Sequence, residues 1–197
     1  RLYQKSCCYS SNKSILTFAA WLTTRTISVF AKGKLVLKRP EGIEEYHIKS
    51  ALYNIGSAIV CVDNVRTDDY VATFAVETDE AIKVLEDNID SGIMPFLEVN
   101  HYFGFTNPTP SLEPGDKLYI PNGFNKRISD WATNIFQFSH EGIDDVHIEI
   151  ISCKEDILEL KLTGETDDIS DSLDTRYKSR IYLHACFKLN PETAPSF

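Results

Sequence analysis

The C-terminal third of the chain alternates apolar and polar residues with a period of two. Such alternation is typical of antiparallel strands that turn one face to the core and the other to water. Earlier in the chain, further segments rich in β-branched and aromatic residues also predict short strands. The strands expected from these patterns are 15–22, 26–31, 35–38, 57–62, 70–76, 146–150, 158–162 and 181–189.

Three other segments place apolar residues three, four or seven positions apart, which predicts amphipathic helices. The second of them has an N-cap candidate in Thr78 or Asp79 and a stop signal in Gly92. The predicted helices and their apolar positions are 44–55 (Ile48, Ala51, Leu52, Ile55), 78–89 (Ile82, Leu85, Ile89) and 128–138 (Ile128, Trp131, Ile135, Phe138).

The composition is that of an ordinary globular protein. The chain has 197 residues, of which 43% are hydrophobic and 25% charged, so it can bury one good core or two small ones. It contains no run of about 18 apolar residues, the length that a membrane-spanning helix needs. No membrane partner is therefore expected.

Charge is distributed unevenly along the chain. Residues 1–40 contain eight Lys and Arg and no acid, whereas the remaining 157 residues carry 12 basic and 29 acidic side chains. A basic segment of +8 on a body of −17 suggests an arm that binds an acidic protein face or, as the only route to nucleic acid, a phosphate backbone. A solvated charge asymmetry and a transit peptide are the alternatives, although "RTISVFAKGKLVLK" resembles strand, turn and strand.

The cysteines argue against a disulfide framework or a zinc site. Cys7 and Cys8 are adjacent, and Cys61, Cys153 and Cys186 lie in apolar runs, where cysteine behaves as a small hydrophobic residue. The CxxC pairs of a structural zinc site are missing. We expect no metal, no cofactor and a reducing compartment such as the cytoplasm.

Catalytic motifs are equally scarce, so no catalytic residue is assigned. The chain has no GxSxG, P-loop or GxGxxG motif. His147 and Glu149 form an H-x-E, but the PCxxC of a zinc deaminase is absent, and two residues on the wet face of a strand are the simpler interpretation. The acidic segment 164–179 lacks the spacing of a calcium loop. An enzyme that assembles its site from distant loops, such as a small hydrolase, stays an alternative.

Residues 70–121 have the order strand, helix, short helix (94–100) and strand. The last strand is framed by "LEPGDKLYIP", in which Pro114 and Gly115 form a turn and Pro121 ends the strand. This stretch resembles a LysM module, whose closing signature is matched by Leu112, Pro114, Gly115, Leu118, Ile120 and Pro121, with Asn100 at the position of the asparagine that ends the second helix.

The resemblance implies an α+β fold, with a small β-α-α-β unit embedded between antiparallel β-rich segments. The domains expected are a basic β-rich segment with one helix (1–69), the LysM-like module (70–121), and a helix followed by antiparallel strands (122–197). The two strands of the module, Tyr70–Val76 and Lys117–Ile120, should pair with each other.

LysM modules bind N-acetylglucosamine polymers, and similar units occur in tailed-phage baseplate subunits as assembly elements. The Gly-Asp-Thr that usually precedes the first helix is replaced here by Glu77, Thr78 and Asp79, where glycan would bind. We therefore expect a non-enzymatic structural protein of a virion or the cytoplasm that contacts other subunits, as in a phage tail or baseplate. A peptidoglycan- or chitin-binding module and an acidic inhibitor or immunity protein are the alternatives.

The aromatic segment 101–111 is the expected contact surface of the module. Its large apolar side chains are numerous for a solvent loop, and two prolines stiffen it. A lid on the module's own core is the alternative. The predicted binding residues are Thr78, Asp79, Asn100, His101, Tyr102, Phe103, Phe105, Asn107 and Pro108.

Overall fold

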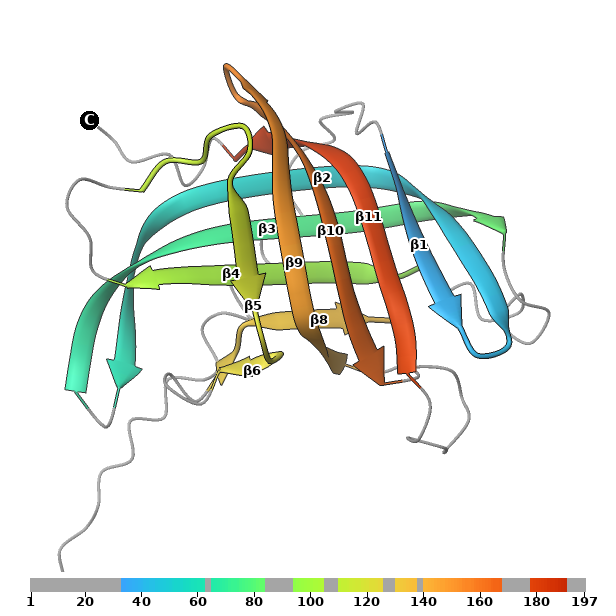
Figure 1. Ribbon diagram of the computed structural model, residues 1–197, viewed down its shortest axis with the longest axis horizontal. Coiled ribbons are helices and arrows are strands. Elements are labelled where there is room, and N and C mark those ends of the chain that lie inside the picture. The colour runs from blue at the N-terminus through green and yellow to red at the C-terminus, as the bar shows by residue number, and fades with distance from the viewer. Residues whose placement is uncertain are drawn as a thin grey trace, which may run out of the picture.

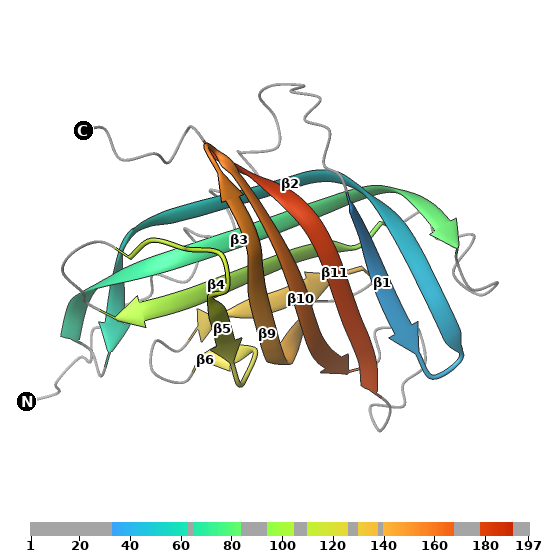
Figure 2. The ribbon, with the colours of Figure 1, turned by 45° about the horizontal axis from the view of Figure 1, so that its top comes forward.

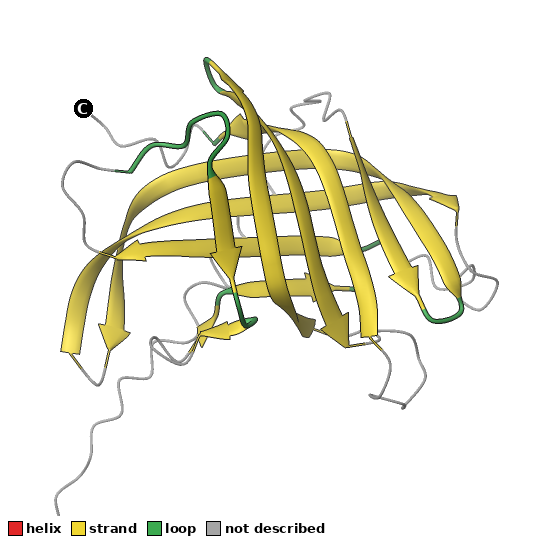
Figure 3. Ribbon diagram, in the orientation of Figure 1, coloured by secondary structure: helices red, strands yellow, loops and turns green. Residues whose placement is uncertain are grey.

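The computed structural model describes residues 33–62, 65–83, 94–104, 110–125, 130–137, 140–167 and 178–190. Within these residues the chain forms strands and connecting loops and no helix, as Figure 3 shows. The strands are β1 (Gly33–Arg39), β2 (Gly42–Val62), β3 (Val65–Lys83), β4 (Phe96–Gly104), β5 (Lys117–Ile120), β6 (Phe124–Asn125), β7 (Asp130–Trp131), β8 (Thr133–Phe136), β9 (His140–Lys154), β10 (Ile157–Asp167) and β11 (Lys178–Leu189).

Eight of these strands close into an antiparallel barrel. Their order around the barrel is β1, β2, β3, β4, β8, β9, β10 and β11, and β11 pairs back with β1. Each strand therefore pairs with the next barrel strand along the chain, which is an up-and-down arrangement. β5 pairs with residues 146–149 of β9, beside the place where β8 pairs with residues 140–142. Strands β5, β9, β10 and β11 cross in front of β2, β3 and β4 (Figures 1 and 2).

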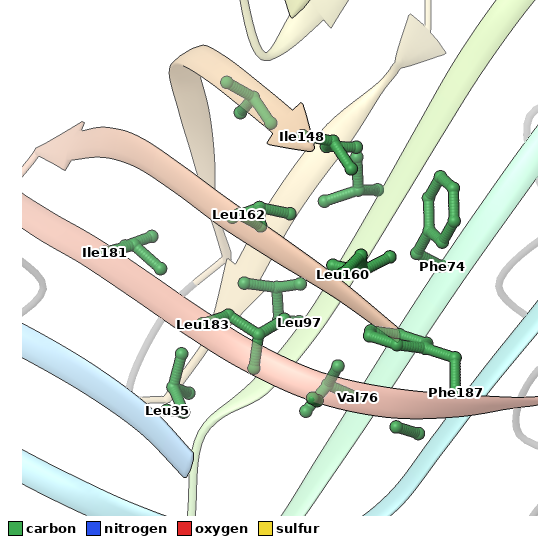
Figure 4. Close-up of a cluster of buried hydrophobic side chains, with 14 of the residues drawn as sticks. Leu35, Phe74, Val76, Leu97, Ile148, Leu160, Leu162, Ile181, Leu183 and Phe187 are labelled. Atoms are coloured by element: carbon green, nitrogen blue, oxygen red, sulfur yellow. The ribbon is translucent and has the colours of Figure 1, made fainter. Parts of the chain in front are cut away.

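The barrel interior is filled by apolar side chains from alternate positions of these strands. Phe74 of β3 and Phe187 of β11 meet there edge to face, with ring centroids 5.9 Å apart, and Figure 4 shows them beside the aliphatic residues of β4, β10 and β11. An eight-stranded barrel has an interior just wide enough for side chains to fill. Fully buried leucines and isoleucines each contribute about 1.5–3 kcal/mol. Those with at most 1% exposure are Leu35, Leu37, Leu97, Ile135, Ile143, Ile148, Ile150, Leu158, Leu160, Leu162 and Ile181.

One end of the barrel buries a polar network instead. Arg39 donates to Glu44 through Nε at 2.5 Å and to the side-chain oxygen of Gln137. Gln137 in turn donates to the hydroxyl of Tyr46 at 2.9 Å. Burial, together with the carboxylate of Glu44, raises the pKa of Tyr46 to about 12. The network joins β1 and β2 to the segment that follows β8, and so ties two regions that are far apart in sequence.

The α+β class predicted from the sequence is wrong. The predicted helix 44–55 lies entirely in β2. Its helical spacing arises from a β-bulge, because the register skips Lys49 between Ile48 and Ser50. Tyr46 and Ile48 are buried two residues apart before the bulge, and the next buried residue, Ala51, follows Ile48 by three positions. This three-residue step across the bulge has the spacing of a helical turn.

The other predicted helices are also strands wherever they are described. Residues 78–83 end β3, and 94–100 run into β4. The segment 128–138 contains β7 and β8, with a bend at Ala132 between them. Residues 84–93, 126–129 and 138–139 lie outside the described residues.

The LysM resemblance fails for the same reason, since a β-α-α-β module needs helices. Residues 70–76 pair with β2 and β4, while β5 pairs with β9, so the two strands of the supposed module are not partners. The turn and the short strand that were predicted within this stretch are nevertheless correct. Pro114 and Gly115 form a turn, Gly115 has a φ of 94°, and the strand that follows ends at Ile120 before Pro121. The nine-stranded sheet combines strands from all three predicted segments, and β6 and β7 form a separate two-stranded sheet.

Candidate interaction surface

The longest hairpin of the barrel extends beyond its neighbours on both sides. β3 pairs with β4 only as far as Tyr70, opposite Gly104. On the other side, β2 is paired with β11 at Leu52 and Tyr53. Beyond these points, residues 58–62 and 65–69 pair only with each other among the described residues, whereas residues 54–57 pair with residues 70–73 of β3, which β4 bonds on their other side. We call residues 54–62 of β2 together with residues 65–73 of β3 the ribbon; its joined ends lie at the left of Figures 1 and 2.

The outer edge of β2 in the ribbon presents backbone groups that no described strand bonds. The carbonyl of Tyr53 accepts a hydrogen bond from the N–H of Asn190, so the backbone of Tyr53 is directed away from β3. Pairing with β3 is regular from Asn54 to Val62. Because backbone direction alternates with a period of two in an antiparallel ladder, the N–H and C=O groups of Ile55, Ser57, Ile59 and Cys61 also point outward.

The ribbon also carries the two most exposed of the large apolar side chains in the described chain. Ile59 is 69% exposed and Val65 is 63% exposed. They lie on opposite faces of the ribbon, because Ile59 is opposite Asp68 and Val65 is opposite Val62. An uncovered strand edge with apolar side chains is a template for pairing with another chain, and the sequence 54–62 contains no charged residue.

The described residues of the predicted site lie on β3 and β4 in different environments. Thr78 is buried and donates to the carbonyl of Pro95 at 2.7 Å, whereas Asp79 next to it is exposed. Asn100 accepts a hydrogen bond from Thr73 Oγ1 at 2.7 Å and donates to Glu98 at 2.9 Å. Phe105, Asn107 and Pro108 lie outside the described residues.

His101, Tyr102 and Phe103 lie at the end of β4. The rings of His101 and Phe103 meet edge to face with centroids 4.8 Å apart, and Phe103 and Tyr102 pack against the core. Burial lowers the pKa of His101, and the carboxylate of Asp69 opposes this only in part.

The H-x-E pair lies on the outer face, as the sequence predicted. His147 and Glu149 are both exposed, and His147 Nε2 is 3.3 Å from Asp145 Oδ1. The ring of His147 stacks on Tyr119 at 4.7 Å, and Asp145 adopts a φ of 51° at a bulge. The side-chain hydrogen bond with Asp145 raises the pKa of Tyr119. His147, Asp145 and Tyr119 are each more than half exposed, and among the described residues no group of three metal-ligating side chains forms here.

Other chemistry is scarce in the described residues. They contain no group of three or more His, Cys, Asp or Glu placed to hold a metal ion. No helix in this part of the chain is long and apolar enough to cross a membrane. Of the basic segment 1–40, only Gly33 onward is described, and there Lys34 and Arg39 form ion pairs with Glu45 and Glu44 of β2.

The chain matches no protein-family model, no curated protein and no solved structure in the comparisons made with them.

The sequence patterns did not predict the ribbon, because its length depends on residues that are distant in the sequence. Both 57–62 and 70–76 are correctly predicted as strands, but their lengths beyond the neighbouring strands depend on pairings with β4 and β11. One signal was available in the sequence. The thirteen residues Ser50–Val62 contain no charged residue and no proline. Charged residues and prolines are what prevent most exposed strand edges from pairing with other chains.

Proposed function

We propose that this protein is a non-enzymatic interaction protein that joins other polypeptides through the free edge of β2 in the ribbon. The observation that carries the proposal is the outward backbone of residues 55–61 in a segment without charge. An added strand can bond to such an edge through main-chain groups, and alternate side chains then supply specificity. The barrel acts as the rigid support that holds the ribbon extended.

The filled interior supports an external site over an internal one. The core side chains of β4, β8, β9, β10 and β11 contact one another across the barrel. Packed side chains therefore occupy the interior. The narrower expectation of a phage tail or baseplate subunit, and that of a glycan-binding module, depended on the LysM resemblance, which the fold contradicts. Our proposal therefore includes neither.

A displayed library of random nine-residue peptides, selected against the purified chain, tests the proposal. Selected peptides should be rich in β-branched residues and should lose binding to a Ser57→Pro variant, in which an outward N–H is replaced. The matched control is Asp68→Pro, which alters the outer edge of β3 in the same ribbon and should keep binding. Peptides that bind both variants equally well, or the absence of any binder, would refute the proposal.

A further inference from the structure

We infer that the partner of the β2 edge is a second copy of this chain, paired antiparallel about a two-fold axis at Ala58. This inference rests on the proposed function and names its partner. The result would be a four-stranded ribbon in the order β3, β2, β2 of the second copy and β3 of the second copy. Two-fold pairing of identical surfaces is the commonest way in which soluble chains associate.

The length of the free edge determines the register. The edge begins at Asn54, after the hydrogen bond between Asn190 and Tyr53, and the strand ends at Val62. Ala58 is the midpoint of this segment. A two-fold axis at Ala58 is therefore the arrangement that pairs the free edge of both copies over its whole length, with the tip of each ribbon reaching the barrel rim of the other.

This register brings the outward backbone groups of the two copies into hydrogen-bonding positions. Ile55 of one copy lies opposite Cys61 of the other, and Ser57 lies opposite Ile59. All four residues have outward N–H and C=O groups, as the alternation from Tyr53 shows. Each such pair exchanges two hydrogen bonds, so the ladder contains about eight in total.

The side chains between these pairs suit close approach. Residues that face each other without direct hydrogen bonds have Cα atoms only about 4.5 Å apart. At the axis that pair is Ala58 with its own copy, and on either side Gly56 faces Val60. A small residue therefore stands at the axis, and a residue without a side chain stands opposite each valine.

Charge favours the edge of β2 over that of β3. Residues 54–62 have no charged side chain, so no like charges oppose one another in the paired ribbon. The free edge of β3 instead carries Arg66 and Asp68, both exposed, which are the kind of residue that prevents edge pairing. Each chain has a net charge of −9, so general repulsion opposes association, and added salt should strengthen it.

Two measurements on the full chain test the inference. Light scattering during size-exclusion chromatography should show a concentration-dependent dimer. The Ser57→Pro substitution should raise the dimer dissociation constant about tenfold or more, because each copy loses one intermolecular donor. Asp68→Pro should leave the constant unchanged. Near-native circular dichroism of both variants establishes that the barrel is folded.

A disulfide test reports the register and does not require the folded chain to tolerate a proline substitution. With Cys61 replaced by serine, Ala58→Cys should form a disulfide-linked dimer under mild oxidation, because the two sulfur-bearing positions meet at the axis within disulfide range. Gly56→Cys in the same background faces Val60 of the other copy and should not cross-link. Equal cross-linking of the two variants would overturn the inferred register.

The outcomes separate this inference from the proposed function. A chain that is monomeric at all concentrations but still captures displayed peptides at the β2 edge would overturn the dimer and keep the proposed function. A monomer that captures no peptide would overturn both. A dimer that Ser57→Pro does not weaken would place the contact elsewhere and overturn the inference.

Discussion

Arg39 and Glu44 form an ion pair with 2.5 Å between Nε and Oε2, and neither side chain has any solvent exposure. The two residues flank the β1–β2 turn, and both point into the end of the barrel. Gln137 accepts a second hydrogen bond from Arg39 and donates one to the hydroxyl of Tyr46. Moving charges out of water is expensive, so each member of the pair is tolerated there because the other balances it.

Removal of one charge from this pair should destabilise the barrel strongly. Glu44→Gln is expected to lower the free energy of unfolding by about 3–5 kcal/mol, because a buried guanidinium loses the carboxylate that balances it. Urea denaturation followed by fluorescence measures the change. Arg39→Leu combined with Glu44→Leu should cost less than the single substitution, since it removes both buried charges.

The neighbouring residue supplies the control for this prediction. Glu45 forms an ion pair with Lys34 at 2.8 Å on the outer face, with side-chain exposures of 28% and 54%. Glu45→Gln should therefore change the free energy of unfolding by less than about 1 kcal/mol. If Glu44→Gln and Glu45→Gln have similar effects, the buried pair does not have the role assigned to it.

Tyr46 should make the barrel sensitive to alkaline pH. Its pKa is about 12 in the folded chain, above the value of 10.0 for an ordinary tyrosine. The neutral phenol predominates in both states below pH 10, so its stabilising effect is complete there. As the pH rises from 10 to 12 the unfolded chain ionises first and stability is lost. The loss should be smaller in Tyr46→Phe, which can be measured by denaturation at several pH values.

Local patterns in the sequence were enough to predict several strands but not their partners. Alternation correctly marks 146–150, 158–162 and 181–189, which lie within β9, β10 and β11. The turn at Pro114 is also correct. In contrast, the bulge at Lys49 disrupts the period of two in β2 and produced a false helix. A local spacing rule cannot separate these cases, because the bulge is specified by pairing with β3.

The candidate interaction surface and the buried network were beyond local reasoning for a related reason. Arg39 and Gln137 are 98 residues apart in sequence, and nothing near either residue indicates the other. Among the described residues, the outer edge of β2 is unpaired beyond Tyr53 because its pairing with β11 ends at Leu189, and β3 is unpaired beyond Tyr70 on the opposite side because its pairing with β4 ends at Gly104. Such features follow from the order of strands around the barrel, which a single sequence does not reveal.

Gly123 should be intolerant of any side chain. A Cβ atom at this position would lie 2.8 Å from both Gly142 Cα and the backbone nitrogen of Ile143. The Gly123 N–H also donates to Asp144 Oδ1 at 2.8 Å. Gly123→Ala is thus expected to destabilise the chain by about 1–3 kcal/mol, the usual cost of forced overpacking. Thermal unfolding measures this change. Gly56→Ala, whose Cβ would meet only the side-chain nitrogen of Asn54 at 3.2 Å, is the control. Both variants are compared at a protein concentration where the chain is monomeric, since Gly56 lies on the proposed dimer edge, and equal losses in the two would contradict the prediction.

His101 should link stability to acidic pH. Burial lowers its pKa from the ordinary 6.5, so the folded chain binds this proton less readily than the unfolded chain does. The contribution of neutral His101 to stability is therefore complete above pH 6.5 and is lost as the pH falls below that value. In His101→Asn the fall in stability between pH 7 and pH 5 should be shallower than in the native chain, as measured by denaturant unfolding at each pH. His184 provides the comparison, because it lies on the outer face, 2.9 Å from Glu159. If His184→Asn flattens the pH dependence and His101→Asn does not, desolvation at the end of β4 is not its cause.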